Sequence, residues 1–294
     1  MTKTPNFICL GAQKAGTTTL HDILKQHPDI YLPEDKEAPF FNEDETYNKG
    51  LDWWMKEYFA DYDGKKLLGV MTPEYLYYEE VPARIFNDCG PDIKLIVILR
   101  QPVDRAYSNY LMSKRRGYEL LPFFEAIDQE TERIKKGSLE RNYLSYIRRS
   151  QYVGQIKRYL DLYKKDQILF LCFETDIREN LKSTIQRVQE FIGVEPLDLN
   201  TDFKSNPAME VRSSKFQQLF HRKFFAKSVY QFIMPAGLRR RIREKLNVMN
   251  RKKLSSDNRL TKDEKKQVYA RFFASEKEEL ESITGLDLNH WVIE

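Results

Sequence analysis

The sequence predicts an α/β fold, with a mostly parallel central sheet flanked by helices and a P-loop-like phosphate-binding loop near the amino terminus. Three observations predict it. Strand-length apolar runs alternate with segments of helical periodicity, which is typical of parallel sheets. The run Lys94–Leu99 has no polar alternation and is rich in branched side chains, as in a strand buried on both faces. A glycine-bounded loop follows the first run. The predicted strands are residues 6–10, 67–71, 94–99 and 167–173.

Apolar side chains at helical spacing predict three long helices. These cover residues 147–163, 177–192 and 261–283. Gly193 suits a helix end, and the last helix should end near Gly285. A chain of 294 residues with 41% hydrophobic content can build one large α/β domain. We expect a single domain over residues 1–294, with the basic helical segment 221–253 as a candidate appendage.

The first loop has the features of a phosphate cradle. The apolar run Phe7–Leu10 ends in a loop bounded by Gly11 and Gly16, and a helical pattern follows. Glycines let backbone N–H groups turn toward an anion, and the helix amino terminus adds further N–H groups and a favourable dipole end. The alternative is an ordinary tight turn between a strand and a helix.

This loop differs from that of the nucleotide hydrolases, where a lysine directly follows the second glycine. Thr17 occupies that place here, and the lysine comes earlier, as Lys14. The lysine should therefore reach a different phosphate oxygen, and the pattern does not require Mg²⁺.

A second basic group follows the strand 94–99. Arg100 lies at its carboxyl end, Pro102 can occupy an early position of the next helix, and Ser108 comes about two turns into that helix. Ligands of open α/β sheets bind outside the carboxyl ends of the strands. Arg100 and Lys14 should therefore share one rim. The alternatives are a surface ion pair of Arg100 with Asp104 and an ordinary helix serine at position 108.

Together these motifs resemble sulfotransferases that use 3′-phosphoadenosine 5′-phosphosulfate. The segment Gln13–Thr18 resembles their 5′-phosphosulfate-binding loop, and Arg100 followed by Ser108 resembles their 3′-phosphate-binding segment. Lys36–Phe41 is similar to the K-E-x-x-F-F segment of the heparan sulfate sulfotransferase branch, and the tail around Trp291 resembles bacterial members. A Lys-Gly-Arg segment that closes over the nucleotide in several members is not found, and residues 204–212 are a candidate for that role.

The resemblance implies a role for each residue of the donor site. Lys14 would neutralise charge on the bridging oxygen, and Arg100 with Ser108 would hold the 3′-phosphate. Backbone N–H groups and threonine hydroxyls of the loop would hold the 5′-phosphate and sulfonate oxygens. These loop residues are Ala15, Gly16, Thr17, Thr18 and Thr19. The donor's charge can be met without a metal, so no metal cofactor is expected.

The acceptor alcohol needs a base, and Glu37 is the candidate that the resemblance implies. Phe40 and Phe41 could pack beneath its loop, and partial burial would raise the proton affinity of the carboxylate. Lys36 could orient the acceptor or assist sulfonate binding. On the residues alone, Glu37 reads as one of several surface carboxylates.

Other candidates are weaker. Glu74 follows the strand 67–71 and could bind acceptor hydroxyls or cap a helix, while His27 precedes a proline and reads as structural. The remaining histidines show no partner pattern. They are His21, His221 and His290.

Composition narrows the setting. The net charge of +4 hides a segment, 221–253, with 11 Lys and Arg against one Glu, so the rest of the chain carries −6. This segment could dock an acidic glycan, an anionic membrane or a partner, or it could be a solvated helical face. No nucleic-acid-binding motif accompanies it. Three dispersed cysteines, no metal-ligand spacing, and no signal or membrane segment favour a cytoplasmic protein without a structural metal, with peripheral membrane contact through 221–253 left open.

The sequence thus predicts a sulfotransferase that moves a sulfuryl group to an acceptor hydroxyl, of a glycan or of another small molecule. One alternative is a Mg²⁺-dependent nucleotide kinase, for which Glu174 at a strand end is the evident metal ligand. Another is a non-catalytic glycan- or membrane-binding protein that uses the basic segment.

Overall fold

The computed structural model describes residues 4–34, 36–64, 66–202, 209–211, 251–253 and 259–293, with the backbone alone at 209–211 and 251–253. The chain divides into two compact units. The first contains residues 1–105, 149–205 and 266–294, and the second contains residues 106–148 and 206–265. The single domain expected from the sequence stays a prediction.

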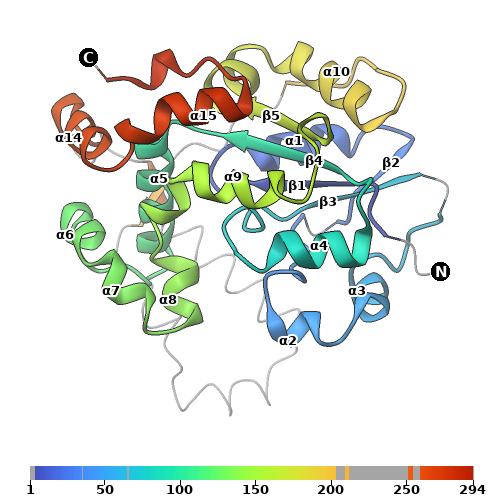
Figure 1. Cartoon of the computed structure of the whole chain (residues 1–294), viewed down its shortest axis with the longest axis horizontal. Helices are drawn as coiled ribbons and strands as arrows, with labels where there is room; N and C mark the ends of the chain where they lie inside the picture. Colours follow the sequence, from blue (N-terminus) through green and yellow to red (C-terminus); the bar gives the residue numbers. More distant parts are fainter. Residues whose placement is uncertain are drawn as a thin grey trace. The chain divides into compact units, whose positions relative to one another are not determined.

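A five-stranded parallel sheet forms the centre of the first unit (Figure 1). Its strand order is β2-β3-β1-β4-β5. The bounds are β1 Phe7–Gly11, β2 Ile30–Tyr31, β3 Leu67–Met71, β4 Lys94–Leu99 and β5 Ile168–Cys172. All five residues of β1 are buried, and so are all of β4 after Lys94. The four predicted strands and their parallel arrangement are confirmed.

Helices cover both faces of this sheet (Figure 1). Because parallel crossovers are right-handed, α1 and α4 must lie on opposite faces, since the chain moves in opposite directions across the sheet after β1 and after β3. Helix α1 contacts α10, and the rings of Phe86 in α4 and Tyr163 after α9 lie 5.6 Å apart. The helices of this unit are α1 Thr17–Leu24, α2 Asp44–Tyr47, α3 Leu51–Tyr58, α4 Val81–Cys89, α9 Tyr152–Leu160, α10 Leu181–Ile192, the larger part of α14 Lys262–Phe272, and α15 Lys277–Thr284.

The long predicted helices differ from those observed. The segment 147–163 begins with a 3₁₀ turn before α9, and a π-helical turn, Phe173–Glu179, precedes α10. The segment 261–283 is two helices, α14 Lys262–Phe272 and α15, separated by a 3₁₀ turn at Ala274–Glu276. The break places the Glu276 carboxylate as acceptor for backbone N–H groups at the start of α9. A tertiary contact therefore overrides the helical periodicity.

The second unit contains the larger part of α5 Pro102–Arg115, and three short helices. These are α6 Phe123–Asp128, α7 Glu130–Ile134 and α8 Ser138–Tyr143. A two-stranded antiparallel sheet pairs β6 Met209–Val211 with β7 Arg251–Lys253. The helix expected over 221–253 is therefore wrong for its last three residues, because they pair as a strand. Residues 221–250 lie outside the described residues, as do 204–208 and Arg212 of the expected closing segment.

Gly69, in the interior strand β3, is expected to tolerate no side chain. A Cβ there would lie 2.1 Å from the Phe7 ring, which is fully buried. We expect Gly69→Ala to lower the free energy of unfolding by about 1–3 kcal/mol, as overpacking does. Gly154→Ala is the matched control, since that helical position has no atom within 4 Å, and it should gain about 0.5–1 kcal/mol. Urea unfolding measures both, and a Gly69→Ala protein as stable as the parent would contradict the packing argument.

Candidate active site

Strand β1 lies between β3 and β4. After β1 the chain continues on the β3 side of the sheet, to β2, and after β3 it crosses to β4 on the other side of β1. In open α/β sheets, such a switch point creates a crevice outside the carboxyl ends of the strands. The loop after β1 and Arg100 after β4 both lie at this edge, because the two strands are neighbours and parallel. The sequence prediction that they share one rim is confirmed.

The loop from Gly11 to Gly16 depends on its glycines. Gly11 has a φ of 140°, and a Cβ there would lie 2.5 Å from the Pro73 carbonyl oxygen. Gly16 has a φ of 90°, and a Cβ there would lie 3.0 Å from the side chains of Ile177 and Phe173. Lys14 also has a positive φ, 75°, which is uncommon for a residue with a Cβ. The backbone is strained there, and the contacts around the loop must hold it in this conformation.

Helix α1 begins directly after this loop. Gly16 is its N-cap, and within the described part of the chain no side chain caps it. The first intrahelical bond of this turn runs from Leu20 N–H to the Gly16 carbonyl. The N–H groups of Thr17, Thr18 and Thr19 therefore precede the helical ladder, and such groups are available to an anion. Thr17 is buried and Thr18 is exposed.

Arg100 contacts the loop directly. Its Nη1 donates a hydrogen bond to the Lys14 carbonyl oxygen at 2.9 Å, and its guanidinium lies 4.9 Å from the centre of the Phe173 ring. Tyr152 donates a hydrogen bond to the Arg100 carbonyl. The Nε of Arg100 is buried with no hydrogen-bond partner among the described residues. The Nη1 of Arg100 thus supports the loop, while its buried Nε is a donor that a ligand could use.

Two further contacts hold the loop, and the sequence did not reveal them. The Gln13 side chain donates to a Glu74 carboxylate oxygen at 3.0 Å, and the Gln13 carbonyl accepts a bond from Arg105 at 3.4 Å. Arg105 is fully buried and also donates to Ser150. Glu74 thus contacts the loop, and the binding of acceptor hydroxyls or the capping of a helix by Glu74 stays a prediction.

The segment after β2 carries Lys36 and Glu37 and rests on an aromatic cluster. Phe40 and Phe41 are fully buried, as expected, and Phe40 stacks on Trp54 with ring centres 5.0 Å apart. Trp54 Nε1 and the Tyr75 hydroxyl both donate to the Ala38 carbonyl. These bonds fix the backbone one residue after Glu37. Trp54 is therefore a core residue, fully buried.

Glu37 itself is half-exposed. Its carboxylate lies 3.5 Å from the Lys36 Nζ, and 53% of its side chain is accessible. Phe40 and Phe41 are buried beneath this segment, but they leave more than half of the Glu37 side chain accessible to solvent. The Lys36 side chain is mostly buried, and its charge acts on Cys9 in β1. Burial is the larger influence on Cys9 and raises the pKa of its thiol to about 11.

Ser108 lies on α5 within the second unit, two turns from Pro102. Its role in binding a 3′-phosphate stays a prediction.

His27 is structural, as the sequence indicated. It is buried, its Nδ1 accepts the Asp29 N–H at 3.0 Å, and its Nε2 donates to the Glu195 carbonyl at 3.0 Å. Both ring nitrogens are therefore occupied, which leaves none to act as a catalytic base.

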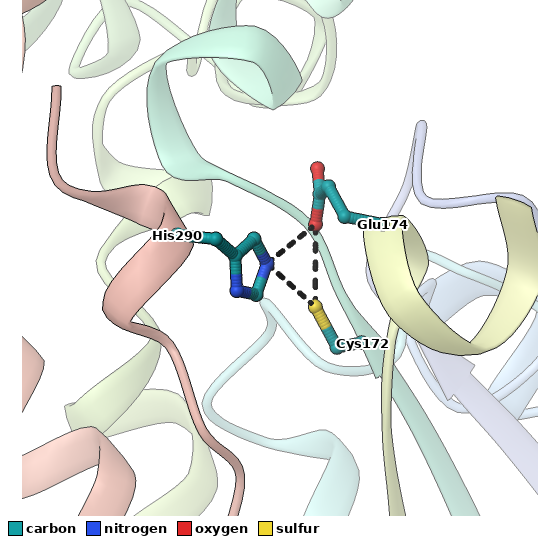
Figure 2. Close-up of side chains that lie close together, drawn as sticks. All are labelled: Cys172, Glu174 and His290. Atoms are coloured by element: carbon teal, nitrogen blue, oxygen red, sulfur yellow. Dashed lines mark hydrogen bonds and ion pairs between the residues drawn. The ribbon is translucent and has the colours of Figure 1, made fainter. Parts of the chain in front are cut away.

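His290, which had no partner pattern in the sequence, lies beside Cys172 and Glu174 (Figure 2). Glu174 is buried and accepts hydrogen bonds from the Gln101 backbone N–H and from Trp291 Nε1. These donors engage both carboxylate oxygens and fix the direction of the side chain. The separation of 118 residues between Cys172 and His290 left no local signal for this cluster.

None of the helices within the described ranges is long and apolar enough to cross a membrane.

The chain is similar to known proteins over most of its length. Residues 4–255 match the family model of the Sulfotransferase domain. Heparan sulfate glucosamine 3-O-sulfotransferase 5 of Homo sapiens is 31% identical over 197 residues, which are 65% of this chain and 54% of that protein. Heparan sulfate glucosamine 3-O-sulfotransferase 3A1 of Mus musculus is 32% identical over 204 residues, 69% of this chain and 49% of that protein. This chain thus spans about half the length of these curated relatives.

A solved structure is similar over almost the whole chain. The crystal structure of a sulfotransferase from Alicyclobacillus acidocaldarius matches with a TM-score of 0.68 and 27% sequence identity. The match covers 98% of this chain and 99% of that one.

Proposed function

Because the chain belongs to the Sulfotransferase domain family, we propose that it transfers a sulfuryl group from 3′-phosphoadenosine 5′-phosphosulfate to a hydroxyl group of a carbohydrate acceptor. One observation carries the donor assignment. The Arg100 guanidinium donates to the Lys14 carbonyl. The Arg100 side chain therefore contacts the stretch of backbone that carries the Lys14 side chain, at one edge of the sheet. A nucleoside with phosphates at both ends requires such a pair of anion sites.

The residues present fit this donor. The N–H groups of Thr17, Thr18 and Thr19 precede the helical ladder of α1, and the Arg100 Nε is a buried donor without a protein partner in the described structure. Backbone N–H groups from Ala15 to Thr18 would hold the 5′-phosphate and sulfonate oxygens. Arg100 would hold the 3′-phosphate, with Ser108 as a proposed helper. The donor supplies an activated sulfuryl group on a phosphate leaving group.

Catalysis by this chain's own residues then needs a cation and a base. Lys14 would neutralise the charge that develops on the bridging oxygen, for which a compact ammonium is suited. Glu37 would take the proton of the acceptor hydroxyl, and its half-exposed position gives it access to an incoming alcohol. Lys36, next to Glu37 and mostly buried, would hold the acceptor or the sulfonate.

The carbohydrate acceptor is proposed from similarity. The two curated relatives are named heparan sulfate glucosamine 3-O-sulfotransferases, and the Lys36–Phe41 segment resembles that branch. The acceptor could equally be another hydroxyl-bearing small molecule. A cytoplasmic location, with peripheral membrane contact through residues 221–253, stays a prediction, and most of that segment lies outside the described residues.

The direct test is transfer of labelled sulfate. The purified chain, incubated with radiolabelled donor and a panel of glycans with free hydroxyls, should label at least one acceptor, and a chelator should not reduce the label. ATP turnover that the chelator abolishes, with no sulfate transfer, would favour the kinase alternative. Glycan binding with neither reaction would favour the non-catalytic alternative.

Lys14→Ala and Arg100→Ala should each weaken the binding of adenosine 3′,5′-bisphosphate by about 10–100-fold. A hydrogen bond to a charged group is worth about 1.5–3 kcal/mol, which corresponds to that range. Calorimetry measures the affinity directly. Lys25→Ala is the matched control, because Lys25 lies just after α1 and pairs with the exposed Glu34, so its loss should leave the affinity unchanged. Parental affinity in both test variants would remove the donor-site assignment.

A further inference from the structure

We propose that Cys172, Glu174 and His290 form a binding site for one thiophilic divalent cation of the zinc type (Figure 2). All three belong to the first unit and meet where β5 ends, beside the carboxyl-terminal turn Asn289–Trp291. The site adjoins the donor site, since Glu174 accepts the N–H of Gln101, the residue after Arg100, but none of its three residues has a role in the proposed transfer reaction.

The separations between the donor atoms suit a tetrahedral ion. Cys172 Sγ lies 3.3 Å from Glu174 Oε2 and 3.5 Å from His290 Nε2, and His290 Nε2 lies 4.0 Å from Glu174 Oε2. Zinc bonds of about 2.3 Å to sulfur and about 2.0–2.1 Å to nitrogen or oxygen place tetrahedral ligand atoms roughly 3.3–3.6 Å apart. Two of the three separations lie in that range. The third requires His290 Nε2 to move toward Glu174 by roughly 0.6 Å, and its ring is partly exposed.

The chemistry of the donors selects the kind of ion. Thiolate, imidazole and carboxylate together are ligands of zinc and cobalt, whereas magnesium and calcium prefer oxygen alone. Three protein ligands also leave a fourth position, which water can fill. Within the part of the chain that the structure describes, this is the one group of three or more His, Cys, Asp or Glu side chains arranged to hold a metal.

The surroundings hold two ligands in place before any ion arrives. Glu174 Oε1 accepts the Gln101 N–H at 3.1 Å, and its Oε2 accepts Trp291 Nε1 at 3.2 Å. The Cys172 N–H donates to Asp176 at 2.6 Å. Such outer contacts orient metal ligands. Cys172 and Glu174 are buried, while about a third of the His290 side chain is exposed, so an ion can enter past the imidazole.

An ion here would join two distant parts of the first unit. It would link the end of β5 to the carboxyl-terminal turn, next to the Gln101 side chain that donates to the Trp291 carbonyl. Since an ion that binds only the folded state stabilises it, the carboxyl-terminal turn should be held more firmly with the metal than without it.

The test uses the 294-residue chain without an affinity tag, first freed of metal by a chelator. Titration with Co²⁺ should give one equivalent bound and a thiolate-to-cobalt charge-transfer band. Cys172→Ser should abolish the band, and His290→Ala should weaken binding at least 10-fold. Cys89→Ser is the matched control, because Cys89 lies in α4 away from the cluster and should leave the band unchanged.

A second measurement covers the chance that Cys172→Ser does not fold. Zn²⁺ should raise the melting temperature of the parent and of Cys89→Ser but not that of His290→Ala, whose changed side chain is partly exposed. Absence of a charge-transfer band in the parent, or equal Co²⁺ binding in His290→Ala, would overturn the proposal and leave a hydrogen-bonded cluster without an ion. Neither outcome bears on sulfate transfer, so the proposed function stands or falls separately.

Discussion

Replacing Glu37 with Gln is expected to lower kcat of sulfuryl transfer by about 10²–10⁴-fold, the usual contribution of a positioned base. The amide has nearly the same shape as the carboxylate but cannot take the acceptor's proton. Because Lys14, Arg100 and the loop are unchanged, binding of adenosine 3′,5′-bisphosphate should persist. Single-turnover transfer of labelled sulfate, with calorimetry of the bisphosphate on the same protein, separates the two effects.

Glu34→Gln is the matched control for Glu37→Gln. Glu34 lies three residues earlier on the same segment, and its side chain is almost wholly exposed and paired with Lys25. Its substitution should leave kcat within about a factor of two, as for a surface ion pair of small worth. Equal rates in Glu37→Gln and the parent would exclude Glu37 as the base. Loss of bisphosphate affinity in Glu37→Gln would instead indicate a disturbed fold.

Arg133→Ala is expected to lower the free energy of unfolding by about 3–5 kcal/mol, because it leaves a buried charge without its partner. Arg133 donates two hydrogen bonds to Glu119, at 2.8 and 3.0 Å, and Glu119 is fully buried in the second unit. Tyr146 donates to the same carboxylate at 2.8 Å. Burial, and then the neighbouring Glu119, hold the pKa of Tyr146 well above its usual range, so the tyrosine remains a donor.

Lys135→Ala is the control for Arg133→Ala. Lys135 pairs with Glu132 on the surface of the same unit, both side chains are more than half-exposed, and the loss should be at most about 1 kcal/mol. Urea unfolding with a probe in the second unit measures both. Exchange of both buried partners, as Glu119→Gln with Arg133→Met, should recover part of the loss, since no uncompensated charge remains. Equal stability of Arg133→Ala and Lys135→Ala would show that the buried pair contributes no more to the free energy of unfolding than a surface ion pair.

The strands and the donor loop could be predicted because their signals are local. Continuous branched apolar residues identify β4, and two glycines around Lys14 identify the loop. The shared rim of Arg100 and Lys14 also followed, because parallel strands of one sheet have their carboxyl ends at the same edge. This step needed only that both strands belong to one parallel sheet, and the resemblance to known motifs supplied the chemistry.

Contacts between distant side chains could not be predicted. Gln13 and Glu74 are 61 residues apart, and the partners Cys172 and His290 are 118 apart, so their meeting depends on the direction of each side chain in the finished fold. The helix expected at 261–283 failed because periodicity carries no information on Glu276 reaching the start of α9.

The bond from Arg100 to the Lys14 carbonyl means that this guanidinium serves the protein as well as any nucleotide. The affinity for the bisphosphate that is lost in Arg100→Ala therefore has two causes, the missing contact with the phosphate and the weakened support of the Lys14 loop. Calorimetry measures only their sum. Arg100→Lys can divide them, since an ammonium keeps the positive charge but lacks the planar fork that can face a carbonyl and a phosphate at once.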